Sequence, residues 1–289
     1  MKKAMFLFLV AILTIASMSA CRIEKAYDSK EPAKIFHLNL TGFTSLNNAS
    51  NCDIHFTQSD TYKVTLKATP AWYDHHSVSV ENGALTIKSD KYKNQKGVTV
   101  LFVNDNQGAE MWISAPSLDE VSLSGSGDLT LDNDYKGKCL SIIRTGSGDT
   151  NTKNVSLTGD FKYSVSGSGD ADMGSVKAKN ASFSVFGSGD VKSGLADVAN
   201  TELTISGSGD ADLNFSNCGN ADVSVTGSGD VTLSGELQTL GKHVSGSGDV
   251  DTSRLRLEKY EVGKCKVSTK QAKLLYIWHS ATIRPSTCK

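Results

Sequence analysis

Apolar and polar residues alternate in short runs from Ile35 onward. In the first run, the apolar residues Phe36, Leu38 and Leu40 occupy every second position. A period of two is the pattern of a β-strand, and we expect further strands at residues 53–58, 62–68, 77–81, 84–89, 98–103 and 110–115. Asn82-Gly83, between two of these strands, predicts a tight hairpin. No window beyond the N-terminal apolar run has a sustained helical period, so the pattern predicts an all-β protein.

The strongest regularity is a five-residue signature, Ser/Thr-Gly-Ser-Gly-Asp, that occurs seven times between residues 121 and 250. One copy departs from the signature, with Phe186 at the first position. The aspartates are spaced by 21, 21, 20, 20, 20 and 19 residues, and they are Asp128, Asp149, Asp170, Asp190, Asp210, Asp230 and Asp249. A fixed period of about 20–50 residues indicates an array in which each repeat buries one face against its neighbours.

Three columns of mostly apolar residues accompany the aspartates. Five residues before each aspartate the column is Leu123, Arg144, Val165, Val185, Ile205, Val225 and Val244. Seven residues before, it is Val121, Ile142, Tyr163, Phe183, Leu203, Val223 and Lys242. One residue after, it is Leu129, Thr150, Ala171, Val191, Ala211, Val231 and Val250. The columns step by two along each strand, so they indicate one buried face.

These columns predict a parallel β-solenoid, or β-helix, with coils of about 20 residues. Each coil would supply a strand, a Gly-Ser-Gly-Asp corner and a second short strand. Stacked about 4.8 Å apart, the columns would become continuous apolar ladders inside the solenoid. A β-propeller is the main alternative, but its blades need about 40 residues and four strands, and the uniform single copies favour the solenoid.

The repeated corner has a structural explanation and a chemical one. Glycine accepts positive φ and close approach of neighbouring coils, while serine and aspartate hydrogen-bond to nearby amides. We therefore expect the aspartates to cap turns. Calcium is the alternative, because calcium-binding β-rolls also combine glycine and aspartate, but one carboxylate per coil supplies few of the six to eight oxygens that calcium prefers. We assign no metal site.

The N-terminus has the layout of an export signal. Lys2 and Lys3 precede an apolar run over residues 4–15, and small residues end at Ala20. Cys21 follows directly, as in a bacterial lipoprotein box, so we expect residues 1–20 to be removed and the Cys21 thiol to carry lipid. An ordinary signal with a chance cysteine is the alternative. The polar residues 21–33 read as a tether.

The composition argues against nucleic-acid binding and leaves the pairing of the cysteines undetermined. The formal net charge is −1, from 30 basic and 31 acidic residues, without a basic stripe, so we expect no nucleic-acid partner. Besides Cys21 there are five cysteines, and no pair forms Cys-x-x-Cys: Cys52, Cys139, Cys218, Cys265 and Cys288. Cys265 and Cys288 could close the C-terminal segment in an oxidising compartment.

No motif for catalysis or for a cofactor stands out, and we expect neither. The serines lack a Gly-x-Ser-x-Gly elbow, and the glycine-rich corners lack the lysine and the helix of a phosphate loop. Residues 72–76, Trp-Tyr-Asp-His-His, could suggest a metal or sugar platform, but a third ligand is not indicated and we favour a solvated loop.

Beyond these patterns the chain resembles a known family. The resemblance covers residues 36–43, 51–58, 62–66, 80–87 and 113–128 and continues through the repeats to about Asp251. The order of a β-rich N-terminal part, the Pro116-Ser117-Leu118 junction and Ser-Gly-Ser-Gly-Asp coils is similar to that of the auto-transporter adhesin, head GIN domain family. The resemblance implies an exported β-solenoid, often lipid-anchored, and brings no catalytic residues.

We therefore expect a β-rich N-terminal part at residues 34–120, the repeat solenoid at 121–251 and a C-terminal cap at 252–289. The expected function is adhesion or ligand binding without catalysis, by a lipid-anchored protein of the cell envelope, at the outer membrane. The membrane is the expected partner through the lipid, and the ligand is a carbohydrate or a protein. A polysaccharide-active β-helix enzyme and a structural periplasmic module are the alternatives.

Overall fold

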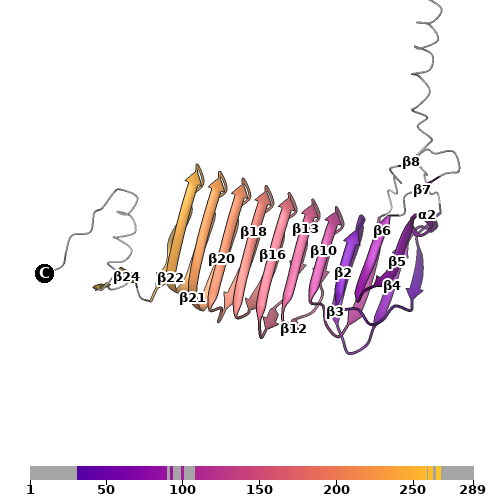
Figure 1. The fold of residues 1–289 in the computed structure, drawn as a ribbon, viewed down its shortest axis with the longest axis horizontal. Helices are drawn as coiled ribbons and strands as arrows, with labels where there is room; N and C mark the ends of the chain where they lie inside the picture. The colour runs from indigo at the N-terminus through magenta and orange to yellow at the C-terminus, as the bar shows by residue number, and fades with distance from the viewer. Residues whose placement is uncertain are drawn as a thin grey trace, which may run out of the picture.

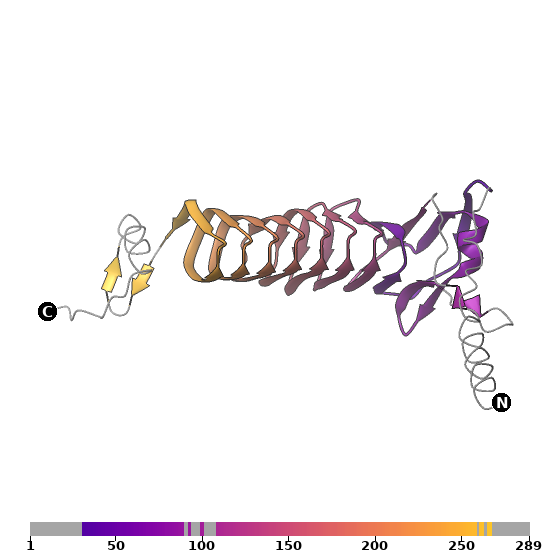
Figure 2. The same cartoon turned by 90° about the horizontal axis from the view of Figure 1, so that it is seen from above.

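The protein is a row of stacked β-coils (Figure 1). The structure, a computed structural model, describes residues 31–89, 92–93, 99–100, 108–258, 260–262 and 265–267. The expected signal peptide, Cys21 and Cys288 lie outside these residues. Seen from above, the strands follow one another along a single long axis (Figure 2). The predicted parallel β-solenoid is confirmed.

Each coil has three sides. Side 1 leads into the Gly-Ser-Gly-Asp corner and consists of β10 (Glu120–Gly125), β13 (Leu140–Gly146), β16 (Asp160–Gly167), β18 (Asn180–Gly187) and β20 (Asn200–Gly207). Side 2 follows the corner, and in the first two repeat coils it consists of β11 (Leu129–Leu131) and β14 (Thr150–Thr152). In the same two coils, side 3 consists of β12 (Tyr135–Gly137) and β15 (Val155–Leu157).

In later coils sides 2 and 3 merge. They form β17 (Ala171–Lys177), β19 (Val191–Ala196) and β23 (Val250–Leu257), while β21 (Ala211–Gly227) and β22 (Val231–Gly246) continue into the next side 1. All neighbouring coils pair in parallel, with each corner glycine opposite the next, as Gly167 is opposite Gly187. Parallel pairing in this register places equivalent residues of successive coils above one another.

The three predicted columns form the core. Tyr163, Phe183 and Leu203, from the column seven residues before the aspartate, are fully buried. The last coil departs from the pattern, because Lys242 is exposed and Val244 is 36% exposed.

Side 3 was not predicted from the sequence. It adds a further interior ladder, in register from coil to coil, of Tyr135, Val155, Val176, Leu195 and Phe215. The expectation of two strands per coil was therefore wrong. A third side lets a coil of about 20 residues enclose its own core.

Two further coils precede the repeats in space. Strands β2 (Ser45–Ala49) and β3 (Cys52–Gln58) pair in parallel with β10 and β11. Beyond them, β6 (Ala84–Ser89) and β9 (Ala109–Ala115) pair in parallel with β2 and β3. Residues 50–53, Ser-Asn-Cys-Asp, thus occupy the place of an eighth corner without its glycines.

Antiparallel strands close this end of the stack. Strand β4 (Lys63–Ala68) pairs antiparallel with β9 and with β1 (Lys34–Leu38), and β5 (His76–Glu81) pairs antiparallel with β6. The β5–β6 turn contains Asn82 and Gly83 with φ of 51° and 78°, so the predicted hairpin is confirmed. Strand β8 (Thr99–Val100) falls inside the strand predicted at residues 98–103, pairs with β7 (Tyr92–Lys93), and is followed by residues outside the described ranges.

Residues 70–75 form a helix rather than the predicted loop. Helix α2 (Pro70–His75) begins after Thr69, whose side chain accepts a hydrogen bond from the Trp72 amide at 3.1 Å. Threonine at the N-cap followed by proline is a helix-start signal that the periodicity of one turn could not reveal. None of the described helices is long and apolar enough to span a membrane.

At the other end, the parallel ladder continues to Leu257, past the expected boundary at Asp251. Strands β24 (Tyr260–Val262) and β25 (Cys265–Val267) then form an antiparallel pair. The remainder of the expected cap lies outside the described residues.

Candidate functional site

The corner is the feature that the sequence repeats most strictly, and neither of its two glycines leaves room for a side chain. The first glycine has φ between 128° and 150° in all seven copies, as at Gly207 with 140°. The second glycine lies against the preceding coil, so that a Cβ built on Gly209 would collide with the carbonyl oxygen of Gly189. A Cβ on the first glycine would collide in the same way, as at Gly207 with the carbonyl oxygen of Gly187. A side chain is therefore sterically excluded at both positions, and at the first position the backbone would also be strained.

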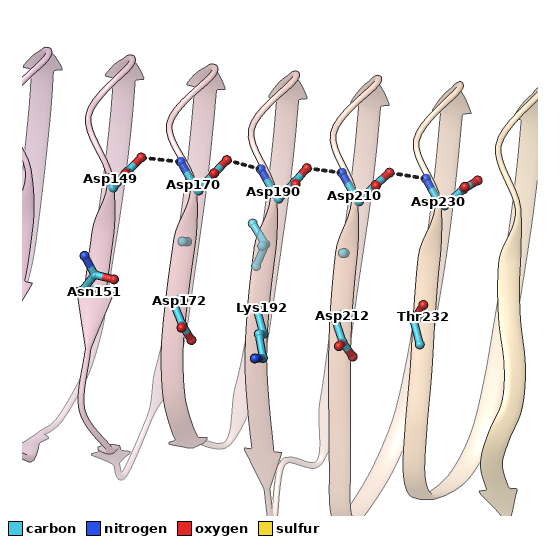
Figure 3. A pocket seen from close by; sticks show the side chains of 13 residues that line it. Asp149, Asn151, Asp170, Asp172, Asp190, Lys192, Asp210, Asp212, Asp230 and Thr232 are labelled. Atoms are coloured by element: carbon cyan, nitrogen blue, oxygen red, sulfur yellow. Dashed lines mark hydrogen bonds between the residues drawn. The ribbon is translucent and has the colours of Figure 1, made fainter.

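The corner aspartates form a continuous ladder of hydrogen bonds. In the first six of the seven corner aspartates, Asp128 to Asp230, the Oδ1 atom accepts a hydrogen bond of 2.7–2.9 Å from the backbone amide of the aspartate in the next coil. Figure 3 shows the part of this ladder from Asp149 to Asp230. The ladder begins in the coil without the signature, where Asp53 accepts from the amide of Asp128 at 2.9 Å. The prediction that these aspartates accept hydrogen bonds from corner amides is confirmed.

Backbone hydrogen bonds run the other way along the same corner. The amide of Thr150 donates to the carbonyl oxygen of Asp170, and the amide of Ala171 donates to that of Asp190, each at 2.8 Å. Each aspartate from Asp128 to Asp230 is thus hydrogen-bonded to both neighbouring coils through its Oδ1 atom and its backbone. The carboxylates therefore form a regularly spaced row along this corner.

A groove of about 400 Å³ lies beside the ladder. One wall is the ladder from Asp149 to Asp230, and the other is the outward row on side 2, two residues after each aspartate. This second row consists of Asn151, Asp172, Lys192, Asp212 and Thr232. Ala171, Val191 and Ala211 complete the lining between the walls. We call this feature the corner groove.

The corner groove is strongly acidic. Seven aspartates line it, and Lys192 is the basic residue among them. Within the described residues none of the seven has a basic side chain within 4.0 Å. Carboxylates one coil apart, at about 4.8 Å, repel by about 1 kcal/mol in water before salt screening. A cationic ligand would relieve this repulsion.

Arg144 lies inside the solenoid at the edge of the ladder. Its side chain is buried, and it donates to the carbonyl oxygens of Gly127 at 3.0 Å and Asp149 at 2.7 Å and to Thr150 Oγ1 at 3.2 Å. Burial lowers the pKa of the Arg144 guanidinium, while Tyr163 and nearby carboxylates oppose that effect. Arg144 therefore joins two corners from within rather than facing a ligand.

No cluster of metal-ligating side chains accompanies the ladder. Among the described residues, no group of three or more His, Cys, Asp or Glu is placed to hold a metal ion. Residues 72–76 have a packing role, because the buried Trp72 ring stacks on His76 at 3.9 Å and its Nε1 donates to Asn51 Oδ1 at 3.1 Å. The platform considered from the sequence is not formed.

Three cysteines in the described residues have free thiols, namely Cys52, Cys139 and Cys218. Cys52 occupies the place of the second glycine in the corner at residues 50–53, and burial raises the pKa of its thiol far above the ordinary value. The proposed pairing of Cys265 with Cys288 falls outside the described side chains.

Sequence reasoning missed an amide ladder on side 1. Asn180 Nδ2 donates to Asp160 at 2.7 Å, Asn200 donates to Asn180 at 2.9 Å, and Asn220 donates to Asn200 at 3.1 Å. The spacing of 20 residues between these asparagines is visible in the sequence. The corner groove was missed for another reason, because its second row varies from coil to coil.

These features define an all-β parallel solenoid with a hydrogen-bonded aspartate ladder along one corner. Its sequence matches the family model described as "Putative auto-transporter adhesin, head GIN domain" over residues 42–217 and 193–265. The chain belongs to this family. No curated protein matches the chain.

Solved structures share the fold at low sequence identity. A "putative adhesin" from Bacteroides fragilis is 21% identical with a TM-score of 0.65, over 77% of this chain and 97% of that one. A "putative lipid binding protein" from Parabacteroides distasonis is 20% identical with a TM-score of 0.66, over 78% and 98%. A "putative adhesin" from Parabacteroides merdae is 16% identical with a TM-score of 0.56, over 78% and 97%.

Proposed function

We propose that this protein is a non-enzymatic adhesin of the cell envelope that binds a basic segment of a partner protein in the corner groove. The observation that carries the proposal is the row of hydrogen-bonded carboxylates, without basic partners among the described residues, along one corner of the stack. Positive charges spaced along an extended peptide could pair with several coils at once. Charge complementarity of this kind sets specificity and association rate.

The absence of catalysis belongs to this proposal. A catalytic site needs a few unique groups with different roles, whereas here the same aspartate recurs in the same environment in every coil. The family description as an adhesin supports the same reading. We favour a protein ligand over the carbohydrate considered from the sequence, because the groove has seven carboxylates and a neutral glycan would leave them unpaired.

Attachment to the membrane through lipid on Cys21 is the second part of the proposal. Its support is the apolar run that ends at Ala20 directly before the cysteine. Metabolic labelling with a fatty-acid analogue should mark the wild-type protein and not the Cys21→Ser variant. Equal labelling of the two proteins would contradict lipidation at this residue.

A binding array tests the groove. The full-length protein is applied to an array of lysine- and arginine-rich peptides, with amino-sugar glycans as a second set. In Asp172→Asn/Asp212→Asn we expect binding of the retained peptides to weaken about ten-fold, since two exposed ion pairs contribute about 0.7 kcal/mol each.

Asp222→Asn is the matched control, because Asp222 is exposed on side 1 and lies outside the groove. It should bind as the wild type does. Retention of glycans instead of peptides, or equal loss in Asp222→Asn, would contradict the proposed site.

A further inference from the structure

The end of the stack near the N-terminus carries the most exposed large apolar side chain of the described residues. Ile35 in β1 is 63% exposed. Tyr73 in α2 is 37% exposed and stacks on Phe36, with 4.2 Å between the ring centroids. Strand β1 pairs with β4 and with no other described strand, and α2 and β4 lie at the end opposite β22 (Figure 1). We call the surface formed by β1 and α2 the terminal surface.

The chain enters the solenoid at the terminal surface. Lys34, the first residue of β1, follows Cys21 by 13 residues, which span at most about 45 Å. The far end of the stack, β23, lies ten strand-to-strand steps from β1, or about 48 Å further along the axis. Lipid on Cys21 would therefore bring the terminal surface, rather than the far end, to a bilayer. A tether this short gives the two surfaces an effective concentration in the millimolar range, so a small apolar contact is enough.

The charged side chains beside Ile35 are paired with one another. Lys67 lies opposite Ile35 in the register of β1 and β4, and its Nζ atom is 3.3 Å from a carboxylate oxygen of Glu110. Lys34, next to Ile35 in the chain, lies 3.1 Å from Glu31. These two pairs leave no net charge around Ile35, so electrostatic complementarity favours neither a polyanion nor a polycation there. A zwitterionic lipid surface fits better, since tyrosine is enriched where proteins meet the headgroup region of a bilayer.

The outer edge of β1 limits the depth of such a contact. Successive side chains of a strand point to opposite faces, so Ile35 and the Tyr73 ring, which stacks on Phe36, flank this edge from opposite sides. No described strand lies beside the edge, and its backbone groups would find no hydrogen-bond partners in hydrocarbon. The backbone of β1 therefore has to stay in the hydrated headgroup region, where only the side chains reach toward the acyl chains.

We infer that the terminal surface lies on a bilayer of zwitterionic phospholipid, with the side chains of Ile35 and Tyr73 in the headgroup region. The inference rests on the lipid proposed for Cys21 and adds a second contact, which the folded protein makes itself. Contact at one end of the stack directs the remaining coils away from the bilayer.

Photolabelling from the lipid side tests the contact. The full-length protein with its lipid is reconstituted in phosphatidylcholine vesicles that contain a phospholipid with a photoreactive headgroup, and flotation measures its attachment. Mass spectrometry then locates the labelled residues, which we expect in β1 and α2 rather than in β16 and β18. In Ile35→Ser/Tyr73→Ser this labelling should fall about ten-fold, since the variant removes apolar surface from the contact. The control Phe186→Ser, which removes an exposed apolar side chain from a middle coil, should be labelled as the wild type is.

The outcomes separate this inference from the proposed lipid. Protein that floats with the vesicles but is labelled evenly along the stack, or equally in Ile35→Ser/Tyr73→Ser, has its lipid without the surface contact, which overturns the inference alone. Absence of label from β1 and α2 would assign the terminal surface to another occupant, such as a second copy. Labelling that appears only after anionic phospholipid is added would contradict the match to a zwitterionic surface. Failure to float would remove the lipid on Cys21 and the contact that rests on it.

Discussion

At the scale of single residues, glycine and aspartate stabilise the corner in different ways. The glycines permit a backbone that other residues cannot adopt or that leaves no room for a side chain. The aspartates contribute a hydrogen bond between coils and leave one oxygen for solvent or ligand. The corner therefore joins successive coils and also forms one wall of the groove. Because an aspartate contributes one hydrogen bond, whereas a glycine is required for the backbone to fit, we expect substitutions of the aspartates to cost less stability than substitutions of the glycines.

Replacement of a second-position glycine should be costly. In Gly209→Val the new side chain would meet the Gly189 carbonyl and, at 3.0 Å, the Val185 side chain. We expect a loss of about 2–3 kcal/mol in the free energy of unfolding, the upper range for an overpacked site. Chemical denaturation measures it, with the exposed neighbour Ser208→Ala as control. Equal stability of the two variants would show that the coils are not closely stacked at this corner.

The aspartate ladder should depend on an acceptor rather than on charge. Asp190→Asn keeps an oxygen that can accept from the Asp210 amide, whereas Asp190→Ala removes it. We expect little change for asparagine and a loss of about 1 kcal/mol for alanine, with millimolar calcium leaving the melting temperature unchanged. A rise of several degrees with calcium that disappears in Asp190→Asn/Asp210→Asn would instead indicate a cation held by the ladder.

At the scale of elements, the sequence predicts those parts of each coil that recur with the same residues in every repeat. Side 1, the corner and the first residues of side 2 recur at nearly fixed spacing, so their strands, buried columns and aspartate ladder follow from the pattern. Side 3 contains residues as different as Tyr135 and Val176, and its register shifts between Met173 and Ser175. The corner at residues 50–53 lacks the glycines and could be found only from its pairing with β10 and β11.

The two walls of the corner groove also differ in how far the sequence predicts them. The wall made by the ladder is predictable, because the aspartate is invariant among the repeats. The opposite wall is not, since Asn151, Asp172 and Lys192 follow no rule except their position two residues after an aspartate. Periodicity reveals a buried face, whereas an outward row is free to vary with its ligand.

Arg144 shows how one position can depart from its column. Six coils place an aliphatic residue there and do without the hydrogen bonds that Arg144 makes. Replacing a buried charge by an apolar residue of similar volume is often stabilising, so Arg144→Met should raise the free energy of unfolding by about 1 kcal/mol. Arg144→Ala should lower it by about 2–3 kcal/mol through the cavity it leaves. Urea denaturation compares the two, and a large loss in Arg144→Met would show that the stack requires the buried hydrogen bonds.

At the scale of the whole molecule, the solenoid is an elongated stack whose Gly-Ser-Gly-Asp corner recurs seven times. Each coil contacts its two neighbours, so stability propagates along the axis and the groove keeps its shape from coil to coil. Antiparallel strands close the end near β5, which leaves no open parallel coil there. An elongated body of this kind would suit the proposed adhesin, which would reach away from a lipid anchor at Cys21.

The proposed adhesion requires that the solenoid be exposed at the cell surface, and protease shaving of intact cells measures this exposure. Cells that produce the full-length protein are treated with a protease that cannot cross the outer membrane, and the solenoid is detected with an antibody. A periplasmic marker protein provides the control for membrane integrity. If the protein is a surface adhesin, the solenoid is lost from intact cells while the marker remains. Protection of the solenoid until the outer membrane is permeabilised would contradict adhesion and favour a periplasmic module.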